Sequence, residues 1–276
     1  MPGISGIAHL DRNRVVTVHD IKPRRVTHSE VWMGMIVLPD FPGDRLLWSP
    51  LRPDFAKVDP PPKDIESISR LPGTSSILIA ESGAIGDEHK RLFQLSEIDA
   101  VWSVERTIKW PWLVKNVEGM EICPAGDRHY FVSAERAEGA ESVEIVWSEV
   151  DLQAFSFGSI HRVPYRPPMV NPGPGQRLIS SLACDQEGVL FGTAAYDPGI
   201  GSGPFRSAVF RIGNFQRVAD SSRLEISQKA DAILISAFKV EGLSIIGRSA
   251  DAPHFEALIA TDDEGMGGAL RKVNLQ

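Results

Sequence analysis

Val117-Glu118-Gly119-Met120 is one of five short stretches that share a pattern and decide the fold. Each stretch begins with an aliphatic residue, continues with Glu or Ser and then a small residue, and ends with a second aliphatic residue. The other four are Ile4-Ser5-Gly6-Ile7, Ile65-Glu66-Ser67-Ile68, Ile179-Ser180-Ser181-Leu182 and Val240-Glu241-Gly242-Leu243. The stretches start roughly 50–60 residues apart, slightly more than the period of a kelch repeat. A period of this length indicates a chain built from repeated supersecondary units.

Each repeat stretch is followed by an apolar run that ends in an acidic residue. The runs span residues 15–20, 77–81, 130–135, 190–197 and 257–263, and they end at Asp20, Glu81, Glu135, Asp197 and Asp263. Clusters of Gly, Pro, Asp and Asn separate the runs. Short apolar runs between frequent turn signals indicate an all-β protein.

Further apolar segments complete the units as four-stranded sheets. Third strands are expected at residues 31–38, 91–95, 143–150, 208–212 and 269–273. Fourth strands are expected at residues 45–48, 103–110, 158–163 and 215–218. Because radially repeated sheets of four antiparallel strands are the blades of a propeller, the sequence predicts a single five-bladed β-propeller domain over residues 1–276. The blades are expected at about residues 1–62, 63–113, 114–174, 175–236 and 237–276.

The last unit differs from the others because it is short and offers only three strands. Only three residues precede the first repeat stretch, so the amino terminus has no segment that could add an outer strand. We therefore expect the ring to close by side-chain packing between the first and last blades, without strand exchange. A two-sheet sandwich is the alternative fold, but it does not explain a five-fold repeat.

Three repeat stretches carry a glutamate that we expect to face the central channel, because the first strand of each blade lines that channel. These residues are Glu66, Glu118 and Glu241, and Ser5 and Ser180 occupy the equivalent places in the other two units. Carboxylates that converge on one axis repel one another unless they are protonated, solvated or bridged by a cation. We therefore expect the three glutamates to hold a divalent cation, Ca²⁺ or Mg²⁺, which prefers hard oxygen ligands.

The acids at the ends of the second strands are candidates for a second set of functional residues. Asp20, Glu81, Glu135 and Asp263 are expected to orient a water molecule as catalytic residues. A small anionic ligand is expected to contact residues of the same loops, namely His19, Arg136, Asp197 and Arg206. Turn capping and salt bridges between blades would give the same sequence pattern, so a purely structural role remains the alternative for each of them.

Composition restricts the partners and the compartment. The 276 residues are 42% hydrophobic and carry a formal net charge of −7, which argues against a nucleic-acid partner. No leader sequence and no long uncharged apolar run are present, so we expect no membrane insertion and a soluble, cytoplasmic protein, although removal of a leader would leave the same sequence. Cys123 and Cys184 are expected to be buried small hydrophobic residues rather than a disulfide or metal ligands.

The glutamate stretches resemble a known family. The inner-strand signature of the esterase-like phytases, Asn/Asp-x-Glu-Gly, is similar to Asp64-Ile65-Glu66-Ser67, Asn116-Val117-Glu118-Gly119 and Lys239-Val240-Glu241-Gly242. The SdiA-regulated propellers share this general pattern. The resemblance implies a propeller, a calcium requirement, and hydrolysis of phosphoesters or carboxyl esters. Ser5 and Ser180 depart from the signature, so their units cannot supply a metal carboxylate from that position.

Two functional hypotheses follow from the sequence. The first is a metal-dependent esterase or phosphatase whose cation lies at an acidic channel mouth. The second is a non-catalytic module that binds another protein through its loop face. The second is favoured by the absence of a Gly-x-Ser-x-Gly, His-Glu-x-x-His or Walker A motif.

Overall fold

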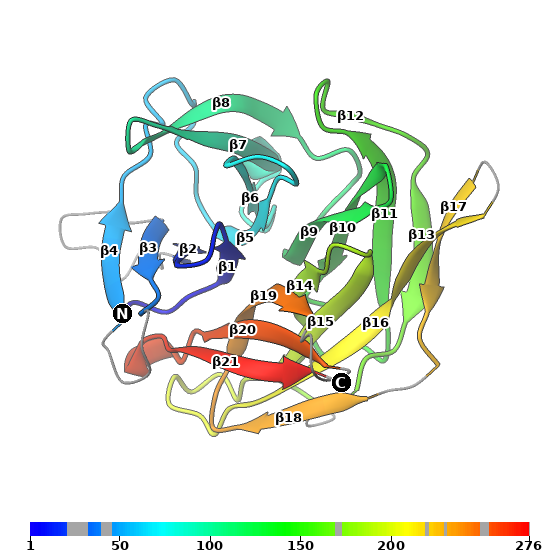
Figure 1. Ribbon diagram of the computed structural model, residues 1–276. Coiled ribbons are helices and arrows are strands. Elements are labelled where there is room, and N and C mark those ends of the chain that lie inside the picture. Colours follow the sequence, from blue (N-terminus) through cyan, green and yellow to red (C-terminus); the bar gives the residue numbers. More distant parts are fainter. Residues whose placement is uncertain are drawn as a thin grey trace.

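Five antiparallel sheets surround a common axis, and this arrangement confirms the predicted all-β, five-bladed propeller (Figure 1). The computed structural model describes residues 1–20, 33–39, 46–168, 173–218, 221–228, 231–248 and 254–275. The described residues contain no α-helix, and two single 3-10 turns occur at Asp87–His89 and Glu264–Met266. No helix in this part of the chain is long and apolar enough to cross a membrane.

The first two blades each have four strands that follow one another from the axis outwards. Blade 1 contains β1 (Gly6–His9), β2 (Arg14–Val18), β3 (Met33–Val37) and β4 (Leu47–Leu51). Blade 2 contains β5 (Ile65–Arg70), β6 (Ile77–Glu81), β7 (Arg91–Ile98) and β8 (Val101–Lys109). The predicted third and fourth strands of blade 1 began at residues 31 and 45, and residues 31, 32 and 45 lie outside the described residues.

Blades 3 and 4 each have a third strand that pairs with two outer strands. Blade 3 contains β9 (Val117–Ala125), β10 (Arg128–Glu135), β11 (Val143–Asp151), β12 (Ser156–Phe157) and β13 (His161–Tyr165). Blade 4 contains β14 (Gln176–Cys184), β15 (Val189–Tyr196), β16 (Arg206–Val218), β17 (Ser221–Ile226) and β18 (Ala232–Ser236). Blade 5 has three strands, β19 (Val240–Arg248), β20 (Phe255–Thr261) and β21 (Leu270–Leu275), as predicted.

The prediction of a fourth strand at residues 215–218 is wrong, because this segment is the second half of the long strand β16. The Gly213-Asn214 pair looks like a turn in the sequence, but the chain stays extended through it. A Cβ atom on Gly213 would lie 2.3 Å from the Glu225 carbonyl oxygen of β17, so glycine is required there for close strand approach. The predicted fourth strand at residues 158–163 overlaps only β13, which begins at His161, and the second outer strand, β12, pairs with β11 before the predicted range.

The hydrophobic core is a ring of clusters between neighbouring blades. The cluster that closes the ring joins Ile4, Ile7 and Val15 of blade 1 to Leu258 and Ala260 of blade 5. Backbone hydrogen bonds support it, because the Ile4 N–H donates to the Thr261 carbonyl at 3.0 Å. Among the described residues no strand of blade 1 enters the blade 5 sheet, so closure occurs without strand exchange, as predicted. The two-sheet sandwich is excluded.

A disulfide joins the inner strands of blades 3 and 4, and it corrects the expectation of two unpaired cysteines. Cys123 in β9 and Cys184 in β14 are bonded, and their Cα atoms lie 5.3 Å apart. The two residues occupy matching places in consecutive units, and matching places on adjacent inner strands are close in a propeller. A disulfide is typical of an oxidising compartment, so it does not favour the cytoplasmic location that the sequence suggested.

Candidate functional site

The glutamates of the repeat stretches occupy the same structural position in blades 2, 3 and 5. In β5, β9 and β19 the pairing with the second strand shifts its register between the residue before the glutamate and the residue after it. Glu66, Glu118 and Glu241 are therefore the extra residues of three β-bulges. Bulges re-aim side chains and are frequent beside functional sites. All three glutamates are buried near the start of their inner strands.

The bulges explain why the repeat stretch can have an aliphatic residue at each end. In a regular strand the first and fourth residues of the stretch would face opposite sides of the sheet. The extra residue at Glu118 changes this alternation, and Val117 and Met120 are both only 1% exposed in the same interblade cluster. A small residue follows the bulge because space is short: a Cβ atom on Gly119 would lie 2.7 Å from Leu182 Cγ of the next blade.

Two of the three glutamates are paired with cations. Arg136 Nε donates to Glu118 Oε1 at 2.7 Å. Arg177 of β14 forms ion pairs with both Glu241 of blade 5 and Asp197 of its own blade. Glu118 and Glu241 are thus neutralised by guanidinium groups, and the second of these ion pairs also ties blade 4 to blade 5.

A buried lysine extends the ionic network around Glu241. Lys239 is only 1% exposed, and its Nζ lies 3.4 Å from Glu241 Oε1 and 2.6 Å from Glu264 Oε1. Asp197 and Asp262 are its other ion-pair partners. Burial raises the pKa of Glu241 to about 7, although Lys239 and Arg177 act in the opposite direction. Burial of Lys239 and Arg177 acts to lower their pKa values. The neighbouring carboxylates, of which Glu241 has the largest effect, outweigh burial and raise both pKa values.

Glu66 has a different environment. Among the described residues it forms no ion pair, and instead it lies with Asp20 and Asp64 in a cluster in which one carboxylate oxygen from each residue lies within 4.8 Å of the other two. Burial raises the pKa of Glu66 well above its usual value, and the charges of Glu118 and Asp20 add to this shift. The cluster therefore favours either a proton on Glu66 or a bound cation.

Local backbone structure positions the other two members of this cluster. Asp64 adopts a left-handed conformation with φ of 55° immediately before β5, and its carboxylate accepts a hydrogen bond from Ser82 Oγ. Asp20 follows β2, and its N–H donates to Ser5 Oγ at 3.0 Å. Ser5 occupies the place of the glutamate in the first repeat stretch, so this unit contributes a hydroxyl group that helps to hold Asp20.

The remaining strand-end acids have local partners. Glu81 is fully buried and accepts hydrogen bonds from Arg91 Nε at 2.8 Å and from the Lys63 N–H at 2.8 Å. Glu135 accepts from the Lys115 N–H at 2.8 Å. These contacts support the structural alternative for both acids, and their catalytic role stays a prediction.

Asp263 and Asp197 also have hydrogen-bond partners. Asp263 accepts from the Lys239 N–H at 2.8 Å and from Thr261 Oγ1 at 2.6 Å. Asp197 accepts from the Gly199 N–H at 2.8 Å, in addition to its ion pair with Arg177. These bonds fix the strand ends beside the ionic network, and a role of either acid in binding or catalysis stays a prediction.

The predicted ligand-binding residues differ in their accessibility. His19 is buried, and its Nδ1 and Nε2 atoms lie 2.6 Å from the Gly3 carbonyl and 2.8 Å from Thr17 Oγ1. Burial lowers the pKa of His19. Arg206 is exposed at the start of β16, whereas the Arg136 side chain reaches the glutamates and is 26% exposed. Arg136 is therefore the most accessible cation that contacts a repeat glutamate.

Sequence reasoning missed Asp64, Arg177 and Lys239 as members of the site. A signal was present, because all three come one or two residues before a repeat stretch. At that point the chain enters an inner strand beside the axis, so a charged side chain there is close to the glutamate that follows. Asp262 and Glu264, which flank the predicted Asp263, were also missed.

Comparisons with known proteins support the fold. No protein-family model matches the sequence, and no curated protein is detectably similar to it in sequence. The structure is similar to an exo-1,5-α-L-arabinanase from a bovine ruminal metagenomic library, with a TM-score of 0.50 and 10% identity over 99% of this chain and 92% of that chain. It is also similar to GH43B of a Bacteroides ovatus xyloglucan locus, with a TM-score of 0.50 and 9% identity over all of this chain and 53% of that chain. At these identities the likeness shows a shared propeller fold, and it gives no particular support to the esterase-like phytase resemblance.

Proposed function

We propose that the protein binds a divalent cation, Ca²⁺ or Mg²⁺, through Asp20, Asp64 and Glu66 at one mouth of the central channel. The observation that carries this proposal is the approach of three carboxylate groups to within 4.8 Å of one another. Carboxylate oxygens on loops and bulges are the ligands that these hard cations prefer. A bound cation would also offset the repulsion that raises the pKa of Glu66.

This ligand set differs from the three repeat glutamates that the sequence suggested. Glu118 and Glu241 are neutralised by Arg136 and Arg177, whereas Glu66 has no ion pair within the described part of the chain. A cation beside Glu118 or Glu241 would be repelled by those guanidinium groups. We therefore assign the cation to the Glu66 side of the axis and the arginines to the side that would receive an anionic group.

We further propose that this mouth is the active site of a hydrolase for phosphoesters or carboxyl esters. A divalent cation supplies Lewis acidity toward a phosphoryl or acyl oxygen. Arg136 is assigned to the anionic part of the substrate, because its side chain is 26% exposed whereas that of Arg177 is 10% exposed. Glu118 is assigned to orienting the water molecule, because among the neighbouring carboxylates its negative charge has the largest effect on the pKa of Glu66.

Glycoside hydrolysis is a second candidate, and the raised pKa of Glu66, next to two further carboxylates, favours it. Glycosidases use one protonated carboxyl group as a general acid and a second, ionised carboxylate. Glu66 has a raised pKa and lies beside Asp20 and Asp64, which gives such a pair without a metal. The two structural neighbours, an exo-1,5-α-L-arabinanase and GH43B, are compatible with this reaction class.

Calorimetric titration with Ca²⁺ tests the cation site directly. We expect binding by the unmodified protein and its loss in Asp64→Asn and Glu66→Gln. Asn is the suitable replacement at residue 64 because it tolerates the left-handed conformation seen there. Glu144→Gln is the matched control, because Glu144 is exposed and lies in β11 of blade 3. Equal Ca²⁺ binding by all four proteins, or by none of them, would refute the proposed site.

Activity assays separate the two hydrolase candidates from the protein-binding alternative. Turnover of 4-nitrophenyl phosphate or 4-nitrophenyl acetate that requires Ca²⁺ and is lost in Glu66→Gln would support the metal-dependent hydrolase. Turnover of 4-nitrophenyl α-L-arabinofuranoside that persists in EDTA and is lost in the same variant would support the glycosidase. No turnover with any of these substrates would favour the protein-binding module at the loop face.

A further inference from the structure

The opposite mouth of the channel contains a cavity that the proposed hydrolase site does not use. It has a volume of about 580 Å³, which lies within the usual range for small-molecule sites. All five blades line it, through residues that come later in the inner strands than the repeat glutamates. Strands rise about 3.3 Å per residue, so this cavity and the Glu66 cluster lie toward opposite ends of the same strands.

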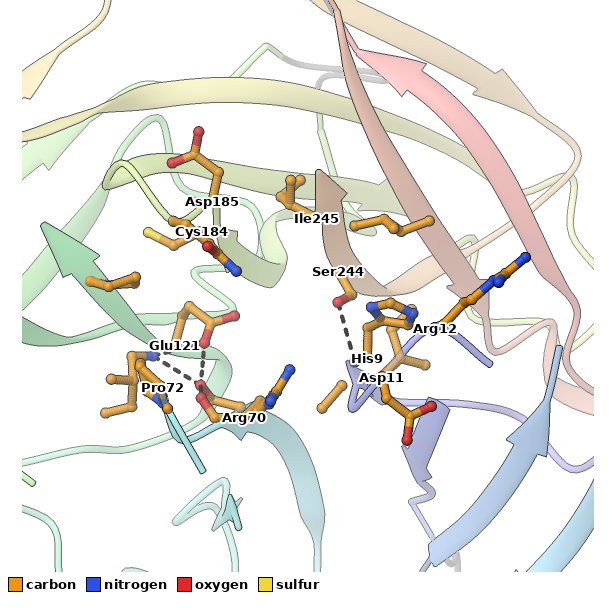
Figure 2. Close-up of a pocket in the computed structure, with 18 residues that line it drawn as sticks. His9, Asp11, Arg12, Arg70, Pro72, Glu121, Cys184, Asp185, Ser244 and Ile245 are labelled. Carbon is orange, nitrogen blue, oxygen red and sulfur yellow. Dashed lines mark hydrogen bonds between the residues drawn. The ribbon is translucent and has the colours of Figure 1, made fainter. Parts of the chain in front are cut away.

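Polar groups face one another across the cavity (Figure 2). Glu121 of β9 lies on one side, and His9 of β1 and Ser244 of β19 lie on the other. His9 Nε2 is buried and has no hydrogen-bond partner among the described residues. Ser244 Oγ accepts from the His9 N–H at 3.4 Å, so its own proton is available to a ligand. The cavity therefore presents polar atoms with unused hydrogen-bonding capacity.

Glu121 presents a neutral acid to this cavity at pH 7. Burial raises the pKa of Glu121 to about 8. Its Oε1 atom accepts a hydrogen bond from the Ile122 N–H at 2.8 Å and another from Ser69 Oγ. The Cys184 N–H also bonds this carboxyl group, and the proton that the raised pKa keeps on it makes Glu121 a hydrogen-bond donor as well.

One of the two arginines that line the cavity points into it. Arg70 extends from the end of β5 toward the space between Glu121 and His9, whereas Arg12 points away (Figure 2). Arg70 uses Nε to bond the Thr74 carbonyl at 3.1 Å, and its terminal nitrogens make no hydrogen bond within the described part of the chain. Its charge also contributes to the lowered pKa of His9, after the larger effect of burial.

The acids at the rim are already engaged. Asp11 pairs with Arg14 Nε at 2.7 Å and accepts from two backbone N–H groups. Asp185 accepts from the Glu187 and Val189 N–H groups at 2.9 and 2.8 Å. The cavity thus combines neutral donors with a guanidinium whose terminal nitrogens have no partner among the described residues, and its walls include aliphatic residues, namely Ile7, Ile122, Ile245 and Ile246.

We propose that this cavity binds a small organic acid, whose carboxylate pairs with Arg70 and accepts from Glu121 and Ser244 while its apolar body contacts the isoleucines. A cation is disfavoured, because Arg70 is positive and the acid that faces it is protonated. The proposal does not depend on the hydrolase, since none of these residues belongs to the Glu66 cluster.

An NMR titration with benzoate and its neutral isostere benzamide tests the proposal at pH 7, with the backbone amides of Glu121 and Ile122 as reporters. We expect benzoate to bind more tightly than benzamide. Arg70→Gln should weaken benzoate binding about tenfold or more, as expected for a lost charge-assisted hydrogen bond, and should leave benzamide binding as the sign of a folded cavity. Arg12→Gln is the matched control and should bind benzoate like the unmodified protein.

The pH dependence supplies an independent readout. Benzoate binding should weaken as the pH rises through about 8, where Glu121 loses its proton, and this step should be absent in Glu121→Gln. The other charged or titratable groups that line the cavity from blades 1, 2 and 4 are His9, Asp11, Arg12, Arg70 and Asp185, and the blade 5 segment contains none. Burial lowers the pKa of His9, which moves its titration away from pH 8, and a step caused by Asp185, whose pKa burial raises, would persist in Glu121→Gln.

Three outcomes would overturn the proposal. The first is benzoate binding that is no tighter than benzamide binding, the second is equal effects of Arg70→Gln and Arg12→Gln, and the third is a set of shifted amides around Glu66 instead of Glu121. Loss of Ca²⁺ binding in the Glu66→Gln variant would leave the proposal unaffected, so the two sites can fail separately.

Discussion

Removal of Arg177 should be among the most destabilising single changes in the protein. Its guanidinium contacts Glu241 and lies 2.8 Å from Asp197 Oδ2, and its side chain is 10% exposed. Arg177→Met would leave two buried carboxylates without this partner, and breaking a buried ion pair costs about 3–5 kcal/mol. Lys239 remains 3.4 Å from Glu241 and 3.5 Å from Asp197, so we expect the low end, about 3 kcal/mol.

Urea unfolding at pH 7 and 25 °C measures this loss. Arg162→Met is the matched control, because Arg162 pairs with Glu144 while their side chains are 45% and 58% exposed, and such a pair contributes at most about 1 kcal/mol. The double variant Arg177→Met/Glu241→Gln should be more stable than Arg177→Met alone, since it removes one unpaired charge. The deficit of Arg177→Met should also grow as the pH rises above 7, because Arg177 lowers the pKa of Glu241 and its loss leaves Glu241 of the variant protonated where that of the unmodified protein has ionised.

Equal losses in Arg177→Met and Arg162→Met would refute this reasoning, because they would show that burial does not strengthen the ionic network. Additional destabilisation on adding Glu241→Gln to Arg177→Met would refute it as well. Either result would mean that Arg177 acts through packing of its stem, and not through the charges of blades 4 and 5.

Three further predictions concern stability. The disulfide Cys123–Cys184 closes a loop with a sequence separation of 61, so replacing both cysteines with Ala should lower the free energy of unfolding by about 4 kcal/mol according to the chain-entropy relation. Urea unfolding without reductant measures this loss, and an unchanged free energy of unfolding would contradict the observed bond. The folded-state pKa of Glu121, about 8, exceeds its unfolded value of 4.5, so between these pH values the folded state binds the extra proton. The free energy of unfolding should therefore fall by a few kcal/mol as the pH rises from about 4.5 to 8. Glu121→Gln should reduce this dependence of stability on pH, and an unchanged dependence would exclude the raised pKa. Gly119→Ala should cost about 1–3 kcal/mol, because the added Cβ would lie 2.7 Å from Leu182 Cγ, and a thermal midpoint equal to that of the unmodified protein would show that the blades are less closely packed.

The fold could be predicted because it is determined by local sequence patterns that repeat along the chain. Each unit carries the same aliphatic, polar and small positions, and the spacing of the units leaves room for about four strands. The short last unit correctly predicted a three-stranded blade. The ends of the strands were harder to predict from the sequence. Gly213 is an example, because a glycine that permits the close approach of β17 cannot be distinguished in the sequence from a glycine in a turn.

The candidate site could be predicted only in part, because pairing between blades is not a local property. The positions of Glu66, Glu118 and Glu241 follow from the repeat, but the bulges that aim them are visible only in the strand register. Arg136 neutralises Glu118 from the end of the same blade and Arg177 neutralises Glu241 from the neighbouring blade, so only the three-dimensional structure shows that Glu66 has no ion pair among the described residues. The disulfide and the Glu121 cavity likewise depend on contacts between neighbouring inner strands.

The most direct test of the proposed site is anomalous diffraction from crystals grown with Mn²⁺, a cation that shares the preference for carboxylate ligands. The account predicts an anomalous peak bounded by Asp20, Asp64 and Glu66, and no peak between Glu118 and Arg136. Anomalous density only at other carboxylates, with Asp20, Asp64 and Glu66 apart and solvated, would contradict it.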